Sequence, residues 1–183
     1  MFFFVDREQI YYINEAVAYL ERRTCLKFPR RTTERDYIFI TGDSVGCAAA
    51  VGRRGGPQRI RLQPHAIETG CFRFFTIVHE FIHALGFHHM QNTFDRDDYV
   101  EINWENVRSD SVGSFHLRPD TEVSHFDVPY DVGSVMHYSQ FAFSGNGLPT
   151  MTPISNPHER TMGQRTEATA EDILRINRMY NCV

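Results

Sequence analysis

The sequence has no apolar run long enough for a transmembrane helix, so no membrane-spanning segment is expected. It also lacks a basic excess: the formal charge is -4 over 183 residues, and the arginines are scattered in short groups such as Arg22 with Arg23. This pattern argues against a groove for nucleic acid or a patch for anionic membranes. Neither an internal repeat nor a low-complexity tract is present, and the length of 183 residues suits one domain or two small lobes around a cleft.

The cysteines lack the Cys-x-x-Cys spacing of a zinc ribbon or a redox pair; they are Cys25, Cys47, Cys71 and Cys182. Two disulfides are the simplest interpretation, with three possible pairings, and four free buried thiols are the alternative. Disulfides imply an oxidising compartment, so a secreted or extracellular location is expected. The start lacks a secretory signal because Asp6 ends the apolar run, so we expect either that a signal and any pro-segment were removed or that the start is unusual.

Helical periodicity is present near both ends of the chain. A helix is expected over residues 6–23, with Asp6 as its N-cap. Its apolar stripe consists of Ile10, Ile13, Val17 and Leu20. A closing helix is expected over residues 170–180, with Thr169 as its N-cap. The residues expected on its buried side are Ile173, Ile176 and Tyr180.

Between these helices lie short β-rich runs, at residues 26–28, 37–40, 46–51 and 59–62. A further helix is expected over residues 75–85, a helical turn near residues 103–106, and irregular structure from there to about residue 168. We therefore expect an α+β fold in a single domain, residues 1–183. Its N-terminal lobe, to about residue 89, would hold a twisted β-sheet with two helices. Its C-terminal lobe, from about residue 90, would be irregular and end in a helix, with the active cleft between the lobes.

The most informative stretch, from His79 to His89, reads His-Glu-x-x-His-x-x-Gly-x-x-His. On a helix, His79 and His83 stand at positions i and i+4, so their imidazoles emerge on one face. Gly86 can adopt the left-handed conformation that ends the helix and returns His89 as a third ligand. Three protein ligands leave a fourth position for water, the arrangement of catalytic zinc. Glu80 can reach the zinc-bound water as general base.

Incidental surface histidines on a helix are the alternative interpretation, since His-Glu-x-x-His alone is modest evidence. The full eleven-residue form is much stronger, because it is the signature of the metzincin peptidases. A second feature lies at residues 134–138, which read SVMHY. Met136 follows His89 by 47 residues, where metzincins place the methionine turn beneath the metal.

Together these motifs resemble the astacin family of zinc metalloendopeptidases, which belongs to the metzincin clan. The resemblance covers residues 25–182 and includes DRDDYV at 95–100, INWEN at 102–106 and PYD at 129–131. It implies a zincin-like, two-lobed catalytic domain. It also implies one Zn²⁺ per chain, with Glu80 as general base. The implied ligands are His79, His83 and His89.

The resemblance also implies a role for a tyrosine and a pairing of the four cysteines. In this family the tyrosine two residues after the methionine, here Tyr138, can ligate zinc in the resting enzyme and then donate a hydrogen bond to the oxyanion. A tyrosine that only packs in the floor is the alternative. The implied disulfides pair Cys25 with Cys182 and Cys47 with Cys71.

Similarity further suggests that residues 47–49 are a sheet edge along which an extended peptide lies antiparallel. Many relatives carry an aromatic residue where this chain has Ala48, so weaker selection is expected on the non-primed side. Arg165 resembles an arginine that reaches the pocket after the scissile bond and would favour Asp or Glu there, an ordinary surface arginine being the alternative. The chain departs from the family at Met90, at Thr93 and in its short start, all parts of the activation and N-terminal apparatus.

These observations predict a zinc-dependent endopeptidase that acts on proteins or peptides, with Glu80 activating the zinc-bound water. A monomer is expected, without nucleic-acid or membrane partners. The rival hypothesis is a catalytically silent, zinc-stabilised module that binds a protein partner through the same cleft, and the altered N-terminal apparatus motivates it. Glu80 weighs against that rival, because binding alone does not need this carboxylate. A zinc hydrolase of non-peptide substrates is a third, weaker hypothesis.

Overall fold

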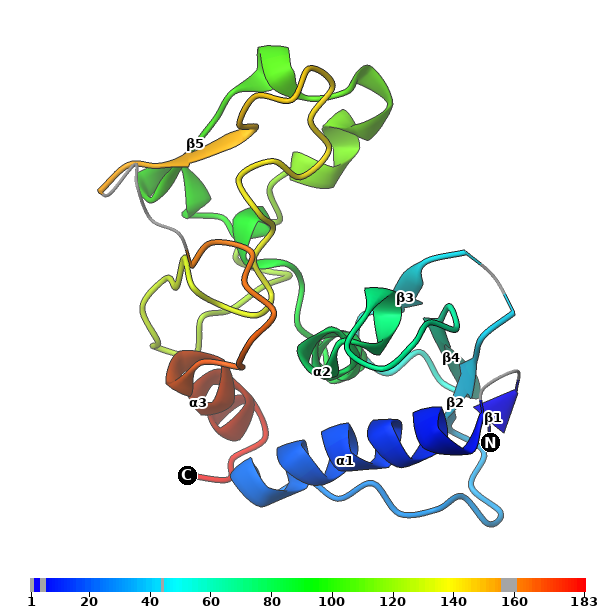
Figure 1. Ribbon diagram of the computed structural model, residues 1–183. Coiled ribbons are helices and arrows are strands. Elements are labelled where there is room, and N and C mark those ends of the chain that lie inside the picture. The colour runs from blue at the N-terminus through cyan, green and yellow to red at the C-terminus, as the bar shows by residue number, and fades with distance from the viewer. Residues whose placement is uncertain (1, 4–5, 44, 156–160) are drawn as a thin grey trace. The chain divides into compact units, whose positions relative to one another are not determined.

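The computed structural model describes residues 2–3, 6–43, 45–155 and 161–183 (Figure 1). The chain forms two compact units, one made of Met1–Phe87 with Ile176–Val183 and the other of His88–Arg175. Helices and sheets occur together, so the α+β class expected from the sequence is confirmed. Among the described helices, none is long and apolar enough to cross a membrane.

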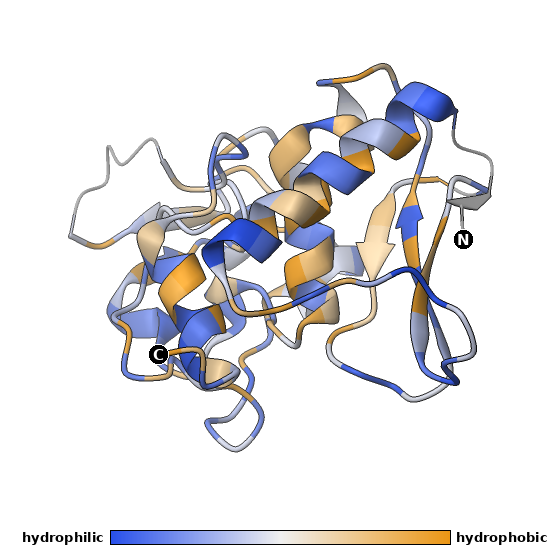
Figure 2. Cartoon of the chain, turned by 90° about the horizontal axis from the view of Figure 1, so that it is seen from below, coloured by the Kyte–Doolittle hydropathy of each residue, from blue (hydrophilic) through white to orange (hydrophobic). Residues whose placement is uncertain are grey.

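The first unit contains the long helix α1, Arg7–Arg23. It begins where expected: the Asp6 carboxylate accepts the Gln9 N–H at 2.8 Å, and the Gln9 side chain accepts the Asp6 N–H at 3.1 Å. This reciprocal capping satisfies two N–H groups that the first turn leaves open. Ile13 and Leu20 are buried, and Figure 2 shows hydrophilic and hydrophobic residues interleaved along the helix. Burial of one stripe packs α1 on α2, Phe74–Ala84.

A four-stranded sheet belongs to the same unit. Its strands are β1, Phe2–Phe3; β2, Tyr37–Thr41; β3, Cys47–Ala49; and β4, Pro57–Leu62. The order is β1-β2-β4-β3, with β1, β2 and β4 parallel and β3 antiparallel to β4. Alternate residues of β4 are buried, which is the pattern of a sheet covered on one face. Within the described residues, β3 is an edge strand.

One predicted β-run was wrong, and another was longer than the strand that forms there. Residues 26–28 form no strand, because the Phe28 N–H donates to the Glu21 carboxylate at 2.7 Å instead of joining a ladder. The run at 46–51 is shortened to β3, since the Ala50 carbonyl accepts from the Gln58 side chain and the Gly52 N–H donates to the His83 carbonyl at 2.9 Å. In both places local polar contacts outweigh β-propensity.

Two disulfides brace the first unit. Cys25 is bonded to Cys182, across 157 residues of sequence, and Cys47 is bonded to Cys71, across 24 residues. The second bond fixes the edge strand β3 to the turn that precedes α2. Such cross-links stabilise a fold mainly by limiting the conformations of the unfolded chain.

The second unit is mostly irregular, as the sequence predicted. Its strands are β5, Val100–Ile102, and β6, Met151–Pro153, which pair antiparallel. Short 3₁₀ turns connect them to their neighbours at Met90–Asn92, Arg96–Asp98, Trp104–Asn106 and Ser109–Phe115. The buried apolar cluster of this unit consists of Val100, Ile102, Val107, Phe115, Met151 and Met162.

Helix α3, Ala170–Met179, closes the chain and begins at the expected cap. The Thr169 hydroxyl accepts the Asp172 N–H at 3.0 Å, and the Asp172 carboxylate accepts the Thr169 N–H at 3.1 Å. Ile176 is fully buried, as predicted. The prediction that Tyr180 is buried was wrong: it is 38% exposed and follows the last residue of α3, and its hydroxyl donates to the Leu85 carbonyl.

Candidate active site

Helix α2 positions the first part of the site. Its residues from Ile77 to His83 are all buried. A polar side chain buried here costs free energy unless it has a hydrogen-bond partner or a metal to bind. His79, Glu80 and His83 are nevertheless among them. The rings of His79 and His83 lie with centroids 4.5 Å apart, which is the result of their i, i+4 spacing on one helical face.

Gly86 ends the helix in the way the spacing predicted. Its φ angle is 115°, a conformation that strongly favours glycine, and its N–H donates to the His83 carbonyl at 2.9 Å. The turn brings a third imidazole into reach. One ring nitrogen from each of His79, His83 and His89 lies within 4.8 Å of the others. Three such nitrogens at that separation can hold one metal ion.

The chemistry of these donors fits zinc. His83 directs Nδ1 to the Phe87 carbonyl at 2.7 Å. Since a carbonyl only accepts, Nδ1 carries the hydrogen and Nε2 keeps its lone pair for a metal. A backbone carbonyl behind a ligand histidine is a usual means of fixing ring orientation and tautomer. Glu80 follows His79 directly in the helix, so its carboxylate belongs to the same buried surroundings.

The 134–138 segment lies against the turn that follows His89. The Met90 N–H donates to the Met136 carbonyl at 3.0 Å, and the Tyr138 N–H donates to the Gln91 side-chain oxygen at 3.1 Å. Tyr138 and His89 have ring centroids 4.4 Å apart. The structure therefore brings Tyr138 beside one of the three histidines, and both bonds fix the backbone that carries it.

His137, between these residues, is fully buried. Burial lowers the pKa of His137 to about 4, so the imidazole is neutral at physiological pH. Its Nδ1 lies 2.8 Å from the Tyr138 carbonyl and therefore carries the hydrogen, while Nε2 accepts from the Tyr130 hydroxyl at 2.9 Å. Burial also raises the pKa of Tyr138, so its phenol keeps its proton near neutral pH.

Arg165 lies beside the same segment. Its guanidinium donates to the His137 carbonyl at 3.2 Å and to the Gln164 carbonyl at 2.7 Å. Thr93, one of the departures from the family pattern, is buried and donates to the Met90 carbonyl at 2.9 Å. Met90 is buried as well, so the two residues that differ from the family pattern both lie buried in the turn after His89.

Some buried polar residues that hold the backbone of this site were not predicted from the sequence. Gln91, His137 and Asp172 are buried polar groups that contact the segment around Tyr138. The only local signal was the spacing of Thr169 and Asp172, which has the form of a capping box. The contact of Gln91 with Tyr138 joins residues 47 positions apart and has no signature in a single sequence.

Several known proteins are similar to this chain. A family model described as Astacin, a peptidase family, matches residues 4–181. Zinc metalloproteinase nas-4 of Caenorhabditis elegans is 41% identical over 162 residues, which are 87% of this chain and 49% of that protein. High choriolytic enzyme 1 of Oryzias latipes is 41% identical over 171 residues, which are 93% of this chain and 60% of that protein. The chain thus spans about half of the length of the first relative.

A solved structure is similar over the whole of this chain. High choriolytic enzyme 1, described as a hatching enzyme zinc-protease from Oryzias latipes (Medaka fish), aligns with 100% of this chain and 90% of its own. The TM-score is 0.87 at 37% sequence identity. The similarity includes both compact units, and so it includes every candidate residue described above.

Proposed function

This chain belongs to the astacin family of peptidases, and on that premise we propose that it hydrolyses peptide bonds as a zinc-dependent metalloendopeptidase. One observation carries the proposal. Three histidine nitrogens lie within 4.8 Å of one another, and Glu80 stands in the same buried helix as two of those histidines. A metal with three protein ligands, an open position and a nearby carboxylate is suited to hydrolysis.

Zinc, when held by His79, His83 and His89, supplies a Lewis acid that polarises the scissile carbonyl and lowers the pKa of the attacking water. Glu80 takes the proton of that water and later delivers it to the leaving amine. Its place directly after His79 keeps the carboxylate near the ligands without making it one of them.

Tyr138 donates its phenolic hydrogen to the oxyanion that develops as the carbonyl is attacked. In the resting enzyme the same oxygen would be a further group able to hold the metal. The ring lies against His89 and packs on Phe115 and Phe143, which supports a small set of positions for the hydroxyl. Met136 gives the site an apolar floor.

The substrate is proposed to lie as an extended strand, antiparallel to β3. An edge strand leaves backbone N–H and C=O groups open, so main-chain hydrogen bonds can hold almost any sequence. Ala48 lies near the middle of this edge and offers only a methyl group for contact. We therefore propose that selection on the non-primed side is weak.

Arg165 is proposed to favour an acidic residue directly after the scissile bond. A charge-assisted hydrogen bond to a carboxylate contributes about 1.5–3 kcal/mol, which corresponds to about 10–150-fold in kcat/KM. Arg165→Ala should lose this factor on peptides with Asp or Glu after the scissile bond. Peptides with a neutral residue there should change by about twofold at most. Equal losses on both peptides would remove Arg165 from the selection of substrate.

The remaining proposals concern the state of the protein. We propose one Zn²⁺ per chain, a single peptidase domain over residues 1–183, and a monomer that binds neither nucleic acid nor membranes. A secreted location is proposed because the two disulfides persist in oxidising compartments. Metal analysis together with analytical ultracentrifugation tests the stoichiometry and the monomer.

Cleavage of a mixed peptide library by the zinc-loaded protein tests the proposed activity. The expected result is a set of internal cuts that a chelator abolishes and added zinc restores. The sequence after each cut reports the preference ascribed to Arg165. A protein that binds zinc at one equivalent and cuts nothing would refute the proposal and favour the silent binding module.

A further inference from the structure

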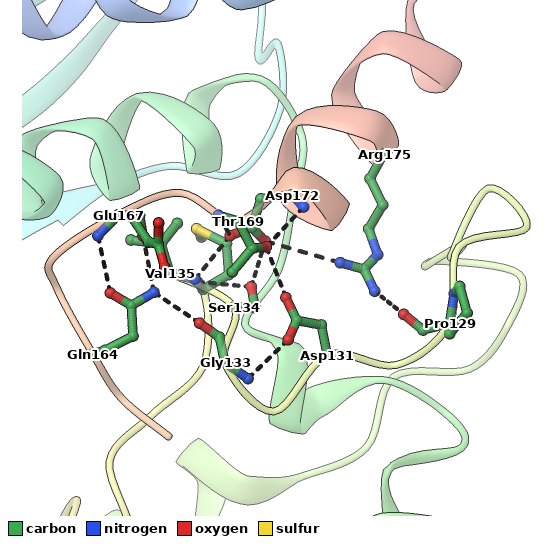
Figure 3. Close-up of polar contacts among 11 residues, drawn as sticks. Pro129, Asp131, Gly133, Ser134, Val135, Gln164, Glu167, Thr169, Asp172 and Arg175 are labelled. Carbon is green, nitrogen blue, oxygen red and sulfur yellow. Dashed lines mark hydrogen bonds and ion pairs between the residues drawn. The ribbon is translucent and has the colours of Figure 1, made fainter. Parts of the chain in front are cut away.

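A carboxylate from a distant part of the chain holds the 134–138 segment. Asp172, the third residue of α3, is 4% exposed. Its Oδ1 accepts the hydroxyl hydrogen of Ser134, and its Oδ2 accepts the Val135 N–H at 2.9 Å. Figure 3 shows these contacts at the start of α3. Ser134 and Asp172 are 38 positions apart in the sequence.

A relay extends the influence of this carboxylate by one more residue. The Met136 N–H donates to the Ser134 hydroxyl oxygen at 3.0 Å. A hydroxyl has one hydrogen, and Ser134 gives it to Asp172, so the Ser134 side chain is held in one orientation. Three consecutive polar groups, from Ser134, Val135 and Met136, therefore depend on one carboxylate. All three residues are buried, so none of these groups has water as a ready replacement.

Asp172 is itself fixed in place. Its Oδ2 also accepts the Thr169 N–H at 3.1 Å, and its own N–H donates to the Thr169 hydroxyl oxygen. That hydroxyl in turn donates to Asp131 at 2.7 Å. Buried Arg175 places its Nη1 3.9 Å from Asp172 and donates from Nη2 to the Pro129 carbonyl, which provides a positive charge nearby (Figure 3). The carboxylate is thus a rigid anchor.

The other end of the segment is fixed independently. Gln91, with no exposed surface, accepts the Tyr138 N–H, and His137 donates to the Tyr138 carbonyl. The place of the Tyr138 phenol therefore depends on both ends of this short segment. Residues 134–136 are the end that Asp172 holds.

We propose that Asp172 is a positioning residue for Tyr138: through Ser134 and Val135 it sets the backbone from which the phenol reaches the oxyanion. The inference rests on the proposed peptidase function and adds a residue to it. Asp172 is assigned no contact with the substrate or the metal. Its effect should therefore appear in the rate of the chemical step and not in peptide binding along β3.

Asp172→Asn is the first variant to make. The amide keeps an oxygen for the N–H groups of Val135 and Thr169, but its NH₂ cannot accept the Ser134 hydrogen. The Ser134 hydroxyl then loses the acceptor that fixes its orientation toward Met136, while the side-chain volume is unchanged. Displacement of one oxyanion donor costs up to about 10²–10³ in kcat, and a shifted donor should cost about 10–100-fold. KM should stay within about twofold, and zinc content should be unchanged.

A double-mutant cycle with Tyr138→Phe separates positioning from general damage. If Asp172 acts through the Tyr138 hydroxyl, Asp172→Asn should lower kcat by about twofold at most once that hydroxyl is absent, since coupled residues are not additive. An equal 10–100-fold loss in both backgrounds would overturn the inference, because the effect would not pass through Tyr138.

Asp131→Asn is the matched control. Asp131 is a second carboxylate at the same junction, and its side chain accepts from Thr169 and from the Gly133 N–H at 2.8 Å instead of from residues 134–138. Its variant should lose stability with kcat within about threefold of the parent. Hydrogen exchange of the peptide covering residues 134–138 gives a readout without activity. Exchange there should rise in Asp172→Asn and rise clearly less in Asp131→Asn, because Asp131 reaches Asp172 only through Thr169.

The two proposals fail differently. A parent protein that cuts no peptide removes the proposed function. A parent that cuts, together with Asp172→Asn at the parental kcat and unchanged exchange, removes only the positioning role. If Asp172→Asn does not fold, Ser134→Ala replaces it in the same cycle, since it breaks the relay and keeps the Val135 contact. A parental kcat for that variant would also refute the inference.

Discussion

Two glycines offer a paired test of packing in the second unit. Gly163 and Gly147 have nearly the same φ angle, 78° and 80°. A Cβ at Gly163 would lie 2.3 Å from the Ser139 Cα and 2.4 Å from its nitrogen, whereas a Cβ at Gly147 would meet nothing within 4 Å. Alanine at either position therefore has the cost of a positive φ, and at Gly163 the clash with the Ser139 backbone is added.

The magnitudes follow from those distances. A left-handed conformation costs an L-residue about 1–2 kcal/mol, offset by about 0.4–1 kcal/mol from the stiffer unfolded chain. Overpacking against backbone adds about 1–3 kcal/mol at Gly163 alone. We expect Gly147→Ala to lower the free energy of unfolding by about 1 kcal/mol and Gly163→Ala by about 2–4 kcal/mol. The latter corresponds to a Tm lower by roughly 4–16 °C.

Thermal and urea unfolding of the parent and both variants, at fixed zinc concentration, give the comparison. The residue after Gly163 is Gln164, whose side chain donates to the Gly133 carbonyl at 2.7 Å, so the clash also disturbs the loop that carries Met136. Gly163→Ala should therefore lose more activity than Gly147→Ala. Equal losses of stability in the two variants would refute the packing argument.

Two further predictions concern cross-links and the core. Replacing both Cys47 and Cys71 by Ser should lower the free energy of unfolding by about 3 kcal/mol, and the same change at Cys25 and Cys182 by about 5 kcal/mol, since the longer loop loses more unfolded-state entropy. Urea unfolding measures the two losses of stability. A larger loss for the Cys47 and Cys71 variant would show that loop length does not decide the size of the loss. Phe115→Ala, at a fully buried position beside Tyr138, should cost about 3–5 kcal/mol and lower kcat; a parental kcat would show that this packing does not support Tyr138.

The local features of the fold and site could be predicted from the sequence. The capped start of α1, the histidine spacing on α2 and the stop at Gly86 each depend on residues within a few positions of one another. Such short-range rules need no knowledge of the tertiary structure. The family resemblance added the pairing of Cys25 with Cys182, which spacing alone left open and which the structure contains.

The rest depended on contacts between distant residues. Nothing near Phe28 in the sequence indicates that its N–H donates to Glu21, so the expected strand at 26–28 was wrong. The partner of Ser134 lies in α3, and the partner of Tyr138 is Gln91. A buried amide or carboxylate has no periodic pattern, and a single sequence shows only its residue type. The supporting contacts of the site were therefore invisible until the fold was known.

The most direct test of the central claim is the activity of Glu80→Gln, measured beside zinc content on the same preparation. We expect about one zinc per chain in parent and variant, because Glu80 is not among the proposed ligands. We also expect kcat/KM on a library-derived peptide to fall by about 10²–10⁴, since general-base catalysis contributes that much. A variant that holds zinc and retains peptide cleavage within about tenfold of the parent would contradict the role of Glu80 and the mechanism built on it.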